Sequence, residues 1–189
     1  MIKNILKYFL ILLMFLVMNS CSNPSDQSKE DDDNWINAND IQIYFSPNNN
    51  IDLIMIREIQ NAKKEISMAI YDITNEKVSD ALIIAHNKGI KVRFYTDKNT
   101  ENEKDIIIKL KENNIEVKIA NPQNWSNVES YRAIMHNKFI VIDENTVITG
   151  SYNFTTNAEE NNRENLLVIP NKIIAKKYYE QFNLYWDNP

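Results

Sequence analysis

Residues 136–153 carry most of the side chains in this chain that could do chemistry. Six notable positions lie within these eighteen residues: His136, Lys138, Asp143, Gly150, Ser151 and Asn153. A neutral imidazole is an adequate nucleophile near neutral pH, because its ordinary pKa is about 6.5. The Lys138 ammonium group and the Asn153 carboxamide could stabilise the negative charge that grows on the non-bridging oxygens of a phosphate under attack. These residue types predict a site that binds and cleaves a phosphate ester.

Two short strands joined by a turn are expected to hold these groups. The apolar run Phe139–Ile142 and the alternating run Thr146–Ile148 predict a β-hairpin, with its turn at Glu144 and Asn145. Such a hairpin brings the start of the first strand beside the end of the second, so both ends of the segment lie at the same end of the sheet.

Alternation along the strands sorts the polar side chains. Residues two apart on a strand share a face. His136 and Lys138 are therefore expected to lie side by side, while Asn137 points away. Ser151 and Asn153 have the same spacing and are expected to form a second pair across the hairpin.

Three further residues are expected to support the site. Glu164 precedes the apolar run Leu166–Ile169, which predicts a buried strand, and its carboxylate could hold one imidazole nitrogen and fix the attacking tautomer. Asp143 sits at the turn, away from His136, and is expected to be structural. Gly150 is one of only two glycines, and a glycine here would let the backbone approach a phosphate closely.

The spacing H-x-K-x4-D-x6-G-S-x-N resembles the signature of the phospholipase D superfamily. Other segments resemble its small, single-motif bacterial endonuclease branch, so that the resemblance extends over residues 41–189: Ile43–Pro47, Ile66–Tyr71, Gly150–Thr155 and Phe182–Trp186. It implies a phospholipase D-like fold and hydrolysis of phosphodiester bonds through a covalent phosphohistidine. His136 would be the nucleophile or the general acid, and the catalytic set would also contain Lys138, Ser151, Asn153 and Glu164.

The chain holds one copy of this motif and no internal repeat. The departing alkoxide needs a proton donor, yet the only other histidine, His86, lies at a predicted helix end before Gly89, where a solvated cation is expected. The resemblance implies a homodimer with a shared active site, in which one histidine attacks and the other donates the proton. No metal or other cofactor is expected, because the covalent route makes a metal-bound hydroxide unnecessary.

The N-terminus predicts export. Lys3 and Lys7 precede the apolar run Tyr8–Met18, which is shorter than the roughly 20 residues of a transmembrane helix and is typical of a signal peptide over residues 1–20. Cys21, the only cysteine, stands where a bacterial lipoprotein carries its lipid. We expect a protein anchored to a membrane of the cell envelope, on the periplasmic side or at the cell surface. An uncleaved anchor and a secreted protein with a free thiol are the alternatives.

Periodicity beyond the N-terminus indicates one α/β domain. Residues 21–40 are nearly all polar and predict a disordered acidic tether, whereas residues 41–189 are long enough for a single core. Strands alternate with helices there, which indicates a mixed, largely parallel sheet flanked by helices. Besides the hairpin, strands are expected at 41–45, 65–73, 90–95, 115–120 and 165–169, and helices at 52–64, 77–88, 103–113 and 172–186.

Charge leaves the substrate open. The chain has 21 basic and 26 acidic residues; three basic and six acidic residues precede residue 41, which leaves 18 and 20 in the domain and a net charge of −2. Nucleic-acid affinity usually shows as a basic surface; Lys91 and Arg93, on one strand face, could form a local patch or an ordinary solvated face. An endonuclease acting on DNA or RNA is the leading interpretation. A phospholipase D acting on membrane lipids and a non-catalytic surface lipoprotein are the alternatives, and the aperiodic segment 121–131 could overhang the cleft and influence substrate choice.

Overall fold

A mixed β-sheet forms the centre of the domain. The computed structural model describes residues 40–98, 104–121, 125 and 133–189. The predicted signal peptide, Cys21, the tether up to residue 39 and most of the segment 121–131 lie outside the described residues.

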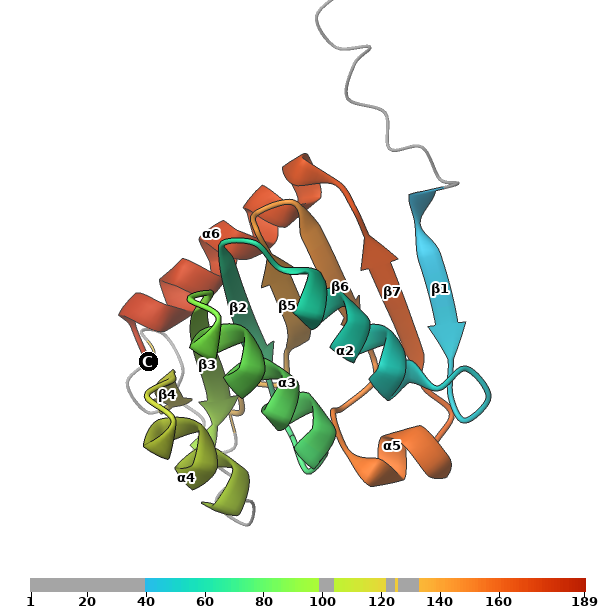
Figure 1. Cartoon of the computed structure of the whole chain (residues 1–189), viewed down its shortest axis with the longest axis horizontal. Helices are drawn as coiled ribbons and strands as arrows, with labels where there is room; N and C mark the ends of the chain where they lie inside the picture. Colours follow the sequence, from blue (N-terminus) through green and yellow to red (C-terminus); the bar gives the residue numbers. More distant parts are fainter. Residues whose placement is uncertain (1–39, 99–103, 122–124, 126–132) are drawn as a thin grey trace, which may run out of the picture. The chain divides into compact units, whose positions relative to one another are not determined.

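Seven strands form this sheet in the order β1-β7-β6-β5-β2-β3-β4 (Figure 1). They are β1 (Gln42–Phe45), β2 (Glu65–Ile70), β3 (Lys91–Asp97), β4 (Glu116–Ala120), β5 (Lys138–Ile142), β6 (Thr146–Gly150) and β7 (Asn165–Ile169). The predicted α/β fold with a mixed sheet flanked by helices is confirmed. Parallel pairing is confined to β2, β3 and β4, so the sheet is less parallel than expected. The hairpin accounts for the antiparallel β5–β6 pair, because a short connection can join only antiparallel neighbours.

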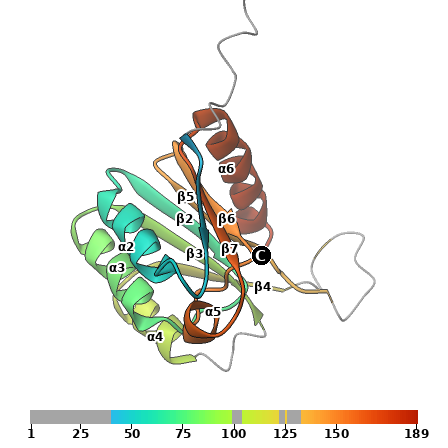
Figure 2. The ribbon, with the colours of Figure 1, turned by 90° about the vertical axis from the view of Figure 1, so that its right-hand side faces the viewer.

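Helices cover the two faces of the sheet unequally. Helices α2 (Ile51–Asn61), α3 (Glu76–Asn87) and α4 (Lys104–Glu112) lie on one face, and α6 (Lys172–Asp187) crosses the other, as Figure 2 shows edge-on. Each face has its own cluster of buried apolar side chains. Strand β5 is covered on both faces, which explains why it is continuously apolar instead of alternating. No helix within the described residues is long and apolar enough to cross a membrane.

A short helix, α5 (Thr156–Glu160), is absent from the elements expected from periodicity. Five residues are too few to show a helical repeat. The helix is specified locally by its N-cap, because Thr155 Oγ1 accepts a hydrogen bond from the Ala158 backbone N–H at 3.1 Å. It follows the end of β6 and lies beside the sheet edge that carries the motif (Figure 1).

Arg93 is buried beneath α6, so Lys91 and Arg93 form neither a basic patch nor a shared solvated face. Its guanidinium donates hydrogen bonds to Ser67 Oγ at 3.0 Å and to Asn183 Oδ1 at 2.9 Å. It also lies 4.8 Å from the centroid of the Phe182 ring. Cation–π contact and hydrogen bonding replace part of the water that the charge loses on burial, while Nε has no partner among the described residues. Arg93 therefore joins α6 to the sheet.

Candidate active site

The predicted site lies where the strands end, at the end of the sheet that contains the last residues of β2 and β3 and the first residue of β5. This end of the sheet is called the motif edge below. The Tyr71 backbone N–H, just after β2, donates to the Asn137 carbonyl, just before β5, at 2.9 Å. The Phe154 N–H, four residues after β6, donates to the Asp72 carbonyl at 3.1 Å. The residues that follow β2 and β6 thus lie against one another and against those that enter β5.

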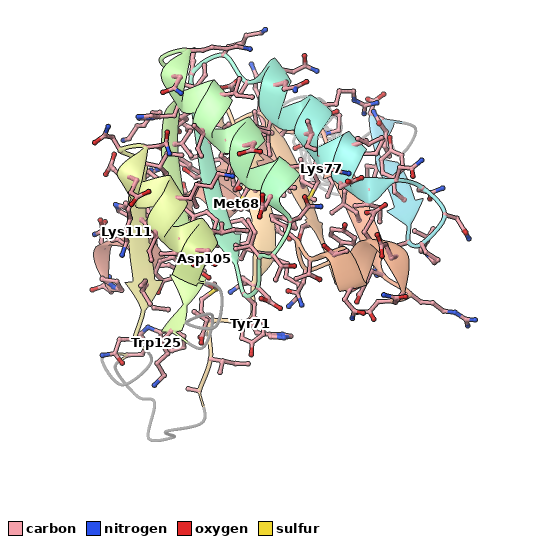
Figure 3. The ribbon with its side chains drawn as sticks, turned by 60° about the horizontal axis from the view of Figure 1, so that its bottom comes forward. Met68, Tyr71, Lys77, Asp105, Lys111 and Trp125 are labelled. Carbon is pink, nitrogen blue, oxygen red and sulfur yellow. The ribbon has the colours of Figure 1, made fainter. Side chains whose placement is uncertain are left out.

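His136 and Lys138 lie in contact at this edge, as their spacing predicts. Lys138 Nζ is 3.2 Å from His136 Nε2 and 3.4 Å from Nδ1, and it donates a hydrogen bond to the His136 carbonyl at 3.1 Å. The Tyr71 ring packs against the imidazole with 4.7 Å between centroids, and Lys138 Nζ lies 5.4 Å from the centre of the same ring. Figure 3 shows Tyr71 at this edge of the ribbon. The His136 side chain is exposed and open to a substrate.

The surroundings of His136 favour its neutral form. Burial of the ring and the neighbouring Lys138 charge lower the pKa of His136, and the charge of Asp97 opposes them. Burial also lowers the pKa of Lys138, against the carboxylates of Glu164 and Asp72, which raise it. A nucleophilic imidazole must be unprotonated, so a lowered pKa suits attack at neutral pH.

Ser151 and Glu164 form a hydrogen-bonded pair at the same edge. Ser151 Oγ donates to Glu164 Oε2 at 2.6 Å, and Asn162 Nδ2 donates to Oε1 at 3.0 Å. The sequence predicts that Glu164 bonds to the imidazole, but in the structure its two oxygens accept from Ser151 and Asn162. Its charge acts instead on Lys138, whose pKa it raises. Glu164 is thus placed to orient Ser151 and to keep Lys138 charged.

Asn153 offers a polar group that the described part of the protein leaves unused. Its Oδ1 is buried and has no hydrogen-bond partner among the described residues. A buried polar atom without a partner costs about 1–3 kcal/mol. Rotation of the carboxamide exchanges Oδ1 with Nδ2, so this position can donate to a phosphate oxygen. The expected pairing of Asn153 with Ser151 on one strand does not form, because β6 ends at Gly150.

Asp143 lies at the opposite end of β5, where its carboxylate caps the start of β2. The two oxygens accept hydrogen bonds from the backbone N–H groups of Lys63 at 2.8 Å, Lys64 at 2.7 Å and Glu65 at 3.0 Å. Asp143 and Glu144 have φ angles of 55° and 51°, so the turn begins one residue earlier than expected. Aspartate tolerates this left-handed conformation better than most residues. These contacts fit the structural role expected of Asp143.

Gly150 has no room for a side chain because of the neighbouring strand. A Cβ atom there would collide with the carbonyl oxygen of Asn165 in β7. The expected reason, close approach of the backbone to a phosphate, is therefore replaced by close packing of β6 on β7. Without a side chain at Gly150, the following Ser151 N–H reaches the Asn165 carbonyl at 3.2 Å, which supports the position of Ser151.

Asp97 is a residue of this region that motif reasoning misses. It ends β3, its side chain is fully buried, and its Oδ2 accepts a hydrogen bond from the Met135 backbone N–H at 2.6 Å. That amide is one residue before His136, and the Asp97 charge raises the pKa of His136. An available signal was its place at the carboxyl end of a parallel strand, where ligands bind in open α/β sheets.

His86 lies near the opposite end of the strands from the motif and cannot reach the site of its own chain. It is in the last turn of α3, which leads into the start of β3. Lys91 at that start pairs with Glu65, the first residue of β2, whereas Lys138 pairs with Ile70, the last residue. The helix-end position predicted for His86 is confirmed, but the ring is half-buried and its Nδ1 has no partner among the described residues, so the side chain is not solvated as expected.

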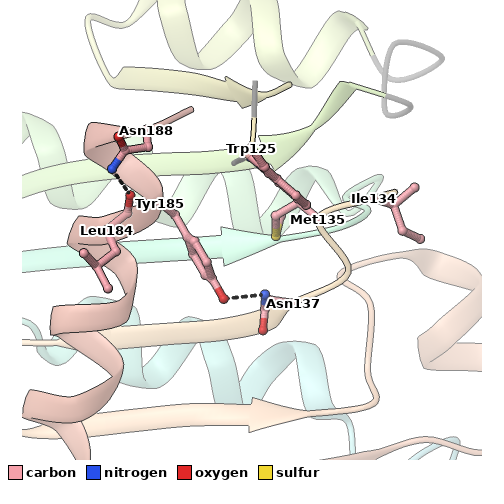
Figure 4. A pocket seen from close by; sticks show the side chains of 7 residues that line it. All are labelled: Trp125, Ile134, Met135, Asn137, Leu184, Tyr185 and Asn188. Carbon is pink, nitrogen blue, oxygen red and sulfur yellow. Dashed lines mark hydrogen bonds between the residues drawn. The ribbon is translucent and has the colours of Figure 1, made fainter. Parts of the chain in front are cut away.

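A pocket of about 490 Å³ lies behind the motif on the α6 face (Figure 4). Its lining is Trp125, Ile134, Met135, Asn137, Leu184, Tyr185 and Asn188. Asn137 Nδ2 donates to the Tyr185 hydroxyl at 3.2 Å, so Asn137 points away from His136 and Lys138 as alternation predicts. Consecutive residues of one segment therefore serve two different surfaces.

No set of three or more His, Cys, Asp or Glu side chains within the described ranges is arranged to hold a metal ion. The polar groups at the motif edge are an imidazole, an ammonium group, a hydroxyl, a carboxamide and a carboxylate.

The family model described as "Cardiolipin synthase, PLD-like domain" matches residues 55–186, from within α2 to α6. The match contains the whole motif and more than half of the chain. The chain belongs to the phospholipase D superfamily. As a member with one motif per chain, it is a phosphodiester hydrolase.

Relatives of this superfamily member include both enzymes and solved structures. Phospholipase D from Rickettsia prowazekii is 28% identical over 148 residues, which span 78% of this chain and 68% of the relative. The phospholipase D family member Nuc from Salmonella typhimurium superposes with a TM-score of 0.68 at 29% identity, covering 78% of this chain and 94% of Nuc. NucT from Helicobacter pylori gives a TM-score of 0.70 at 25% identity, covering 78% and 96%.

Proposed function

We propose that this protein is an endonuclease that hydrolyses phosphodiester bonds of DNA or RNA through a covalent phosphohistidine at His136. The observation that carries the proposal is the contact of His136 Nε2 with Lys138 Nζ at 3.2 Å, at the sheet edge where Ser151 and Glu164 form a second bonded pair. A neutral nucleophile beside a cation is the arrangement that attack on a phosphate anion requires.

The reaction has two steps. A ring nitrogen of His136 attacks phosphorus, the P–N bond forms, and the P–O bond to the leaving alkoxide breaks as that alkoxide takes up a proton. Lys138 and Asn153 stabilise the charge on the non-bridging oxygens, and Glu164 holds Ser151 in place. Water then attacks phosphorus, the P–N bond breaks, and the phosphate product leaves a free imidazole.

We infer that a second copy of the chain supplies the proton. His86 lies near the opposite end of the strands from His136. The superfamily resemblance implies a homodimer in which two motifs meet across a twofold axis. His136 of one copy would attack while His136 of the other donates. The group that protonates the leaving alkoxide in the first step would accept the proton of the attacking water in the second.

Nucleic acid is the favoured substrate because of how the similarities are distributed. Nuc and NucT are covered over 94% and 96% of their own length, whereas the Rickettsia prowazekii phospholipase D is covered over 68%. The motif and its flanking segments also resemble the single-motif endonuclease branch. Together with that resemblance, the match to nearly the whole length of these two structures supports the endonuclease over the second candidate.

Hydrolysis of membrane phospholipid is the second candidate. It is favoured by the relative named phospholipase D. We also propose that the chain is exported and lipid-anchored at Cys21, which would hold the active site next to a bilayer. Cys21→Ser should then move the protein from the membrane fraction to the soluble fraction, since stable anchoring takes two lipid signals or chains. Continued membrane retention would indicate a helical anchor.

The substrate class is tested with the full-length protein purified in mild detergent. Separate reactions contain single-stranded DNA, duplex DNA, RNA or phosphatidylcholine vesicles, each with EDTA and each repeated with His136→Asn. We expect cleavage of nucleic acid that survives the chelator and disappears in the variant. Cleavage of phosphatidylcholine only would replace the endonuclease by the second candidate, and loss of activity with EDTA would contradict the metal-free route.

The shared site is tested by mixing. Wild-type and His136→Asn chains are co-refolded in equal amounts, and exchange of subunits is confirmed by differential tags. Random pairing leaves about half of the wild-type chains in fully wild-type dimers, so activity per wild-type chain should fall to about half. A rate per wild-type chain that does not change would rule out the two-histidine dimer.

A further inference from the structure

The His136 imidazole is not oriented by a carboxylate within the described part of its own chain. Both oxygens of Glu164 accept hydrogen bonds from other side chains. Lys138 Nζ lies 3.2 Å from one ring nitrogen and 3.4 Å from the other, so this contact does not select which nitrogen faces a substrate. A histidine at a functional site is ordinarily held by a hydrogen bond to its second nitrogen. A different contact is needed to orient this ring.

Tyr71 makes such a contact. Its ring packs against the imidazole of His136, with 4.7 Å between the centroids and 59° between the planes. The same ring lies 5.4 Å from Lys138 Nζ, within the range of a cation–π contact. One aromatic side chain therefore touches both members of the pair, and the hydroxyl takes part in neither contact.

The backbone that carries this ring is held on both sides at the motif edge (Figure 3). The Tyr71 N–H donates at 2.9 Å to the carbonyl of Asn137, the residue between the two members of the pair. The carbonyl of the next residue, Asp72, accepts a hydrogen bond from the Phe154 N–H at 3.1 Å. The ring is thus presented to the imidazole by a fixed segment.

Charges and burial act together on the imidazole. Three carboxylates from other segments act on the pair: Asp72, Asp97 and Glu164. Burial is the largest influence on the pKa of His136 and lowers it, the Lys138 charge lowers it further, and the Asp97 charge opposes both. The Tyr71 ring contributes to that burial, because it lies against the imidazole. Its packing therefore favours the neutral form that can attack.

We propose that Tyr71 is a positioning residue, whose ring holds the His136 imidazole and the Lys138 ammonium group in the geometry needed for attack on phosphorus. This inference rests on the proposed function of His136 and deepens it. An aromatic contact restricts the tilt of the imidazole without occupying a ring nitrogen. One nitrogen is then available to attack while the other keeps its proton.

The test uses the full-length protein in mild detergent with bis(4-nitrophenyl) phosphate, a phosphodiester whose hydrolysis does not depend on binding a polymer. Tyr71→Phe keeps the ring and removes the hydroxyl, whereas Tyr71→Ala removes both. Tyr179→Ala is the matched control, since Tyr179 is half-buried on α6 and lies near Glu65, at the opposite end of β2 from the motif edge. Circular dichroism checks the fold of each variant.

Tyr71→Ala should lower kcat by about 10- to 100-fold and change KM little, because a misplaced nucleophile impairs attack more than binding. Loss of burial should also raise the pKa of His136 and move the acid limb of kcat/KM to higher pH. Tyr71→Phe and Tyr179→Ala should keep the wild-type kcat and the wild-type limb.

The pKa of His136 is also measured without turnover, by NMR of protein labelled selectively at histidine. The chain has two histidines, so His86→Asn assigns the two ring signals. The His136 signal should titrate at higher pH in Tyr71→Ala than in the wild type, and Tyr71→Phe should restore the wild-type titration.

Several results would overturn the positioning role. Wild-type kcat and titration in Tyr71→Ala would remove it and leave the proposed function standing. Equal losses in Tyr71→Phe would assign the effect to the hydroxyl, and a fall in kcat without a shifted titration would mean a structural support only. If Tyr71→Ala does not fold, Tyr71→Leu, which keeps apolar bulk, replaces it, and a wild-type kcat there would also remove the role. A wild-type protein that hydrolyses no phosphodiester would instead overturn the proposed function itself.

Discussion

The two ends of strand β5 use residues of the same motif for opposite purposes. At the start of the strand, His136 is exposed and Lys138 Nζ lies against its ring nitrogens. At the far end, Asp143 accepts three backbone hydrogen bonds and caps β2. The motif therefore combines the proposed reactive pair with a structural anchor, and the length of one strand separates them.

The difference lies in how fully each end satisfies its polar groups. The carboxylate of Asp143 has donors on both oxygens, so the hairpin turn is fixed without a ligand. At the other end, Asn153 Oδ1 has no partner among the described residues, and the pKa values of His136 and Lys138 are both lowered by burial. Perturbed and unsatisfied groups of this kind gather at functional sites.

The largest expected effect is at the reactive end. His136→Asn should lower kcat/KM for bis(4-nitrophenyl) phosphate by more than about 10⁴-fold, because no other group can form the covalent intermediate. His86→Asn, the matched change at the opposite sheet edge, should leave the rate unchanged. Circular dichroism checks that both variants fold, and a folded His136→Asn protein with near wild-type activity would contradict the assignment.

Lys138→Gln should have the next largest effect, a loss of about 10²–10³-fold, which is typical for removal of one group that stabilises transition-state charge. The Lys138 charge lowers the pKa of His136, so its removal should raise that pKa and move the acid limb of kcat/KM to higher pH. The pH profile is measured beside that of Lys111→Gln, which alters an exposed cation on α4. An acid limb at the wild-type pH would show that the two side chains do not interact in solution.

Asp97→Asn should shift the same limb in the opposite direction. The charge of Asp97 raises the pKa of His136, so neutralising it should lower that pKa and extend activity to lower pH. We expect a loss of about 10-fold in rate at neutral pH, because the hydrogen bond to the Met135 N–H that leads into His136 is weakened. Asp105→Asn, an exposed change on α4, is the control. A shift to higher pH would contradict the predicted placement of the charge.

Asp143→Ala should have the smallest effect on catalysis and a clear effect on stability. Loss of its three backbone hydrogen bonds should lower the free energy of unfolding by about 2–3 kcal/mol, while activity per folded molecule stays within about twofold. Asp143→Asn should lose less, because the amide oxygen still accepts and asparagine tolerates a φ of 55°. Urea denaturation measures both. A large fall in activity of the folded variant would erase the contrast between the two ends of β5.

Much of the architecture could be predicted from local sequence patterns. The strand Asn165–Ile169 has the bounds that the apolar run predicts, and the other expected strands and helices lie within a few residues of their predicted limits. Periodicity reports which face of an element is buried, and that signal extends over the element itself. The five-residue α5 lacks such a repeat, which is why it escaped prediction.

The contacts of individual polar residues were less predictable. Glu164 was expected on the imidazole and instead holds Ser151, and Arg93 was expected on the surface and instead lies under α6. Asp97 reaches Met135, 38 residues further along the chain. A side chain's partner depends on which segments the fold brings together, and these pairs lie far apart in sequence.

The sequence by itself determined the contact between His136 and Lys138. His136 and Lys138 are two residues apart on an extended segment, and strand geometry places neighbouring side chains of one face in contact. Only the tertiary structure decided what surrounds the pair, because Tyr71, Asp97 and Glu164 reach it from three other strand ends. Hydrogen-bond partners, burial and local charge are properties of that assembled edge, and they set the protonation state of His136.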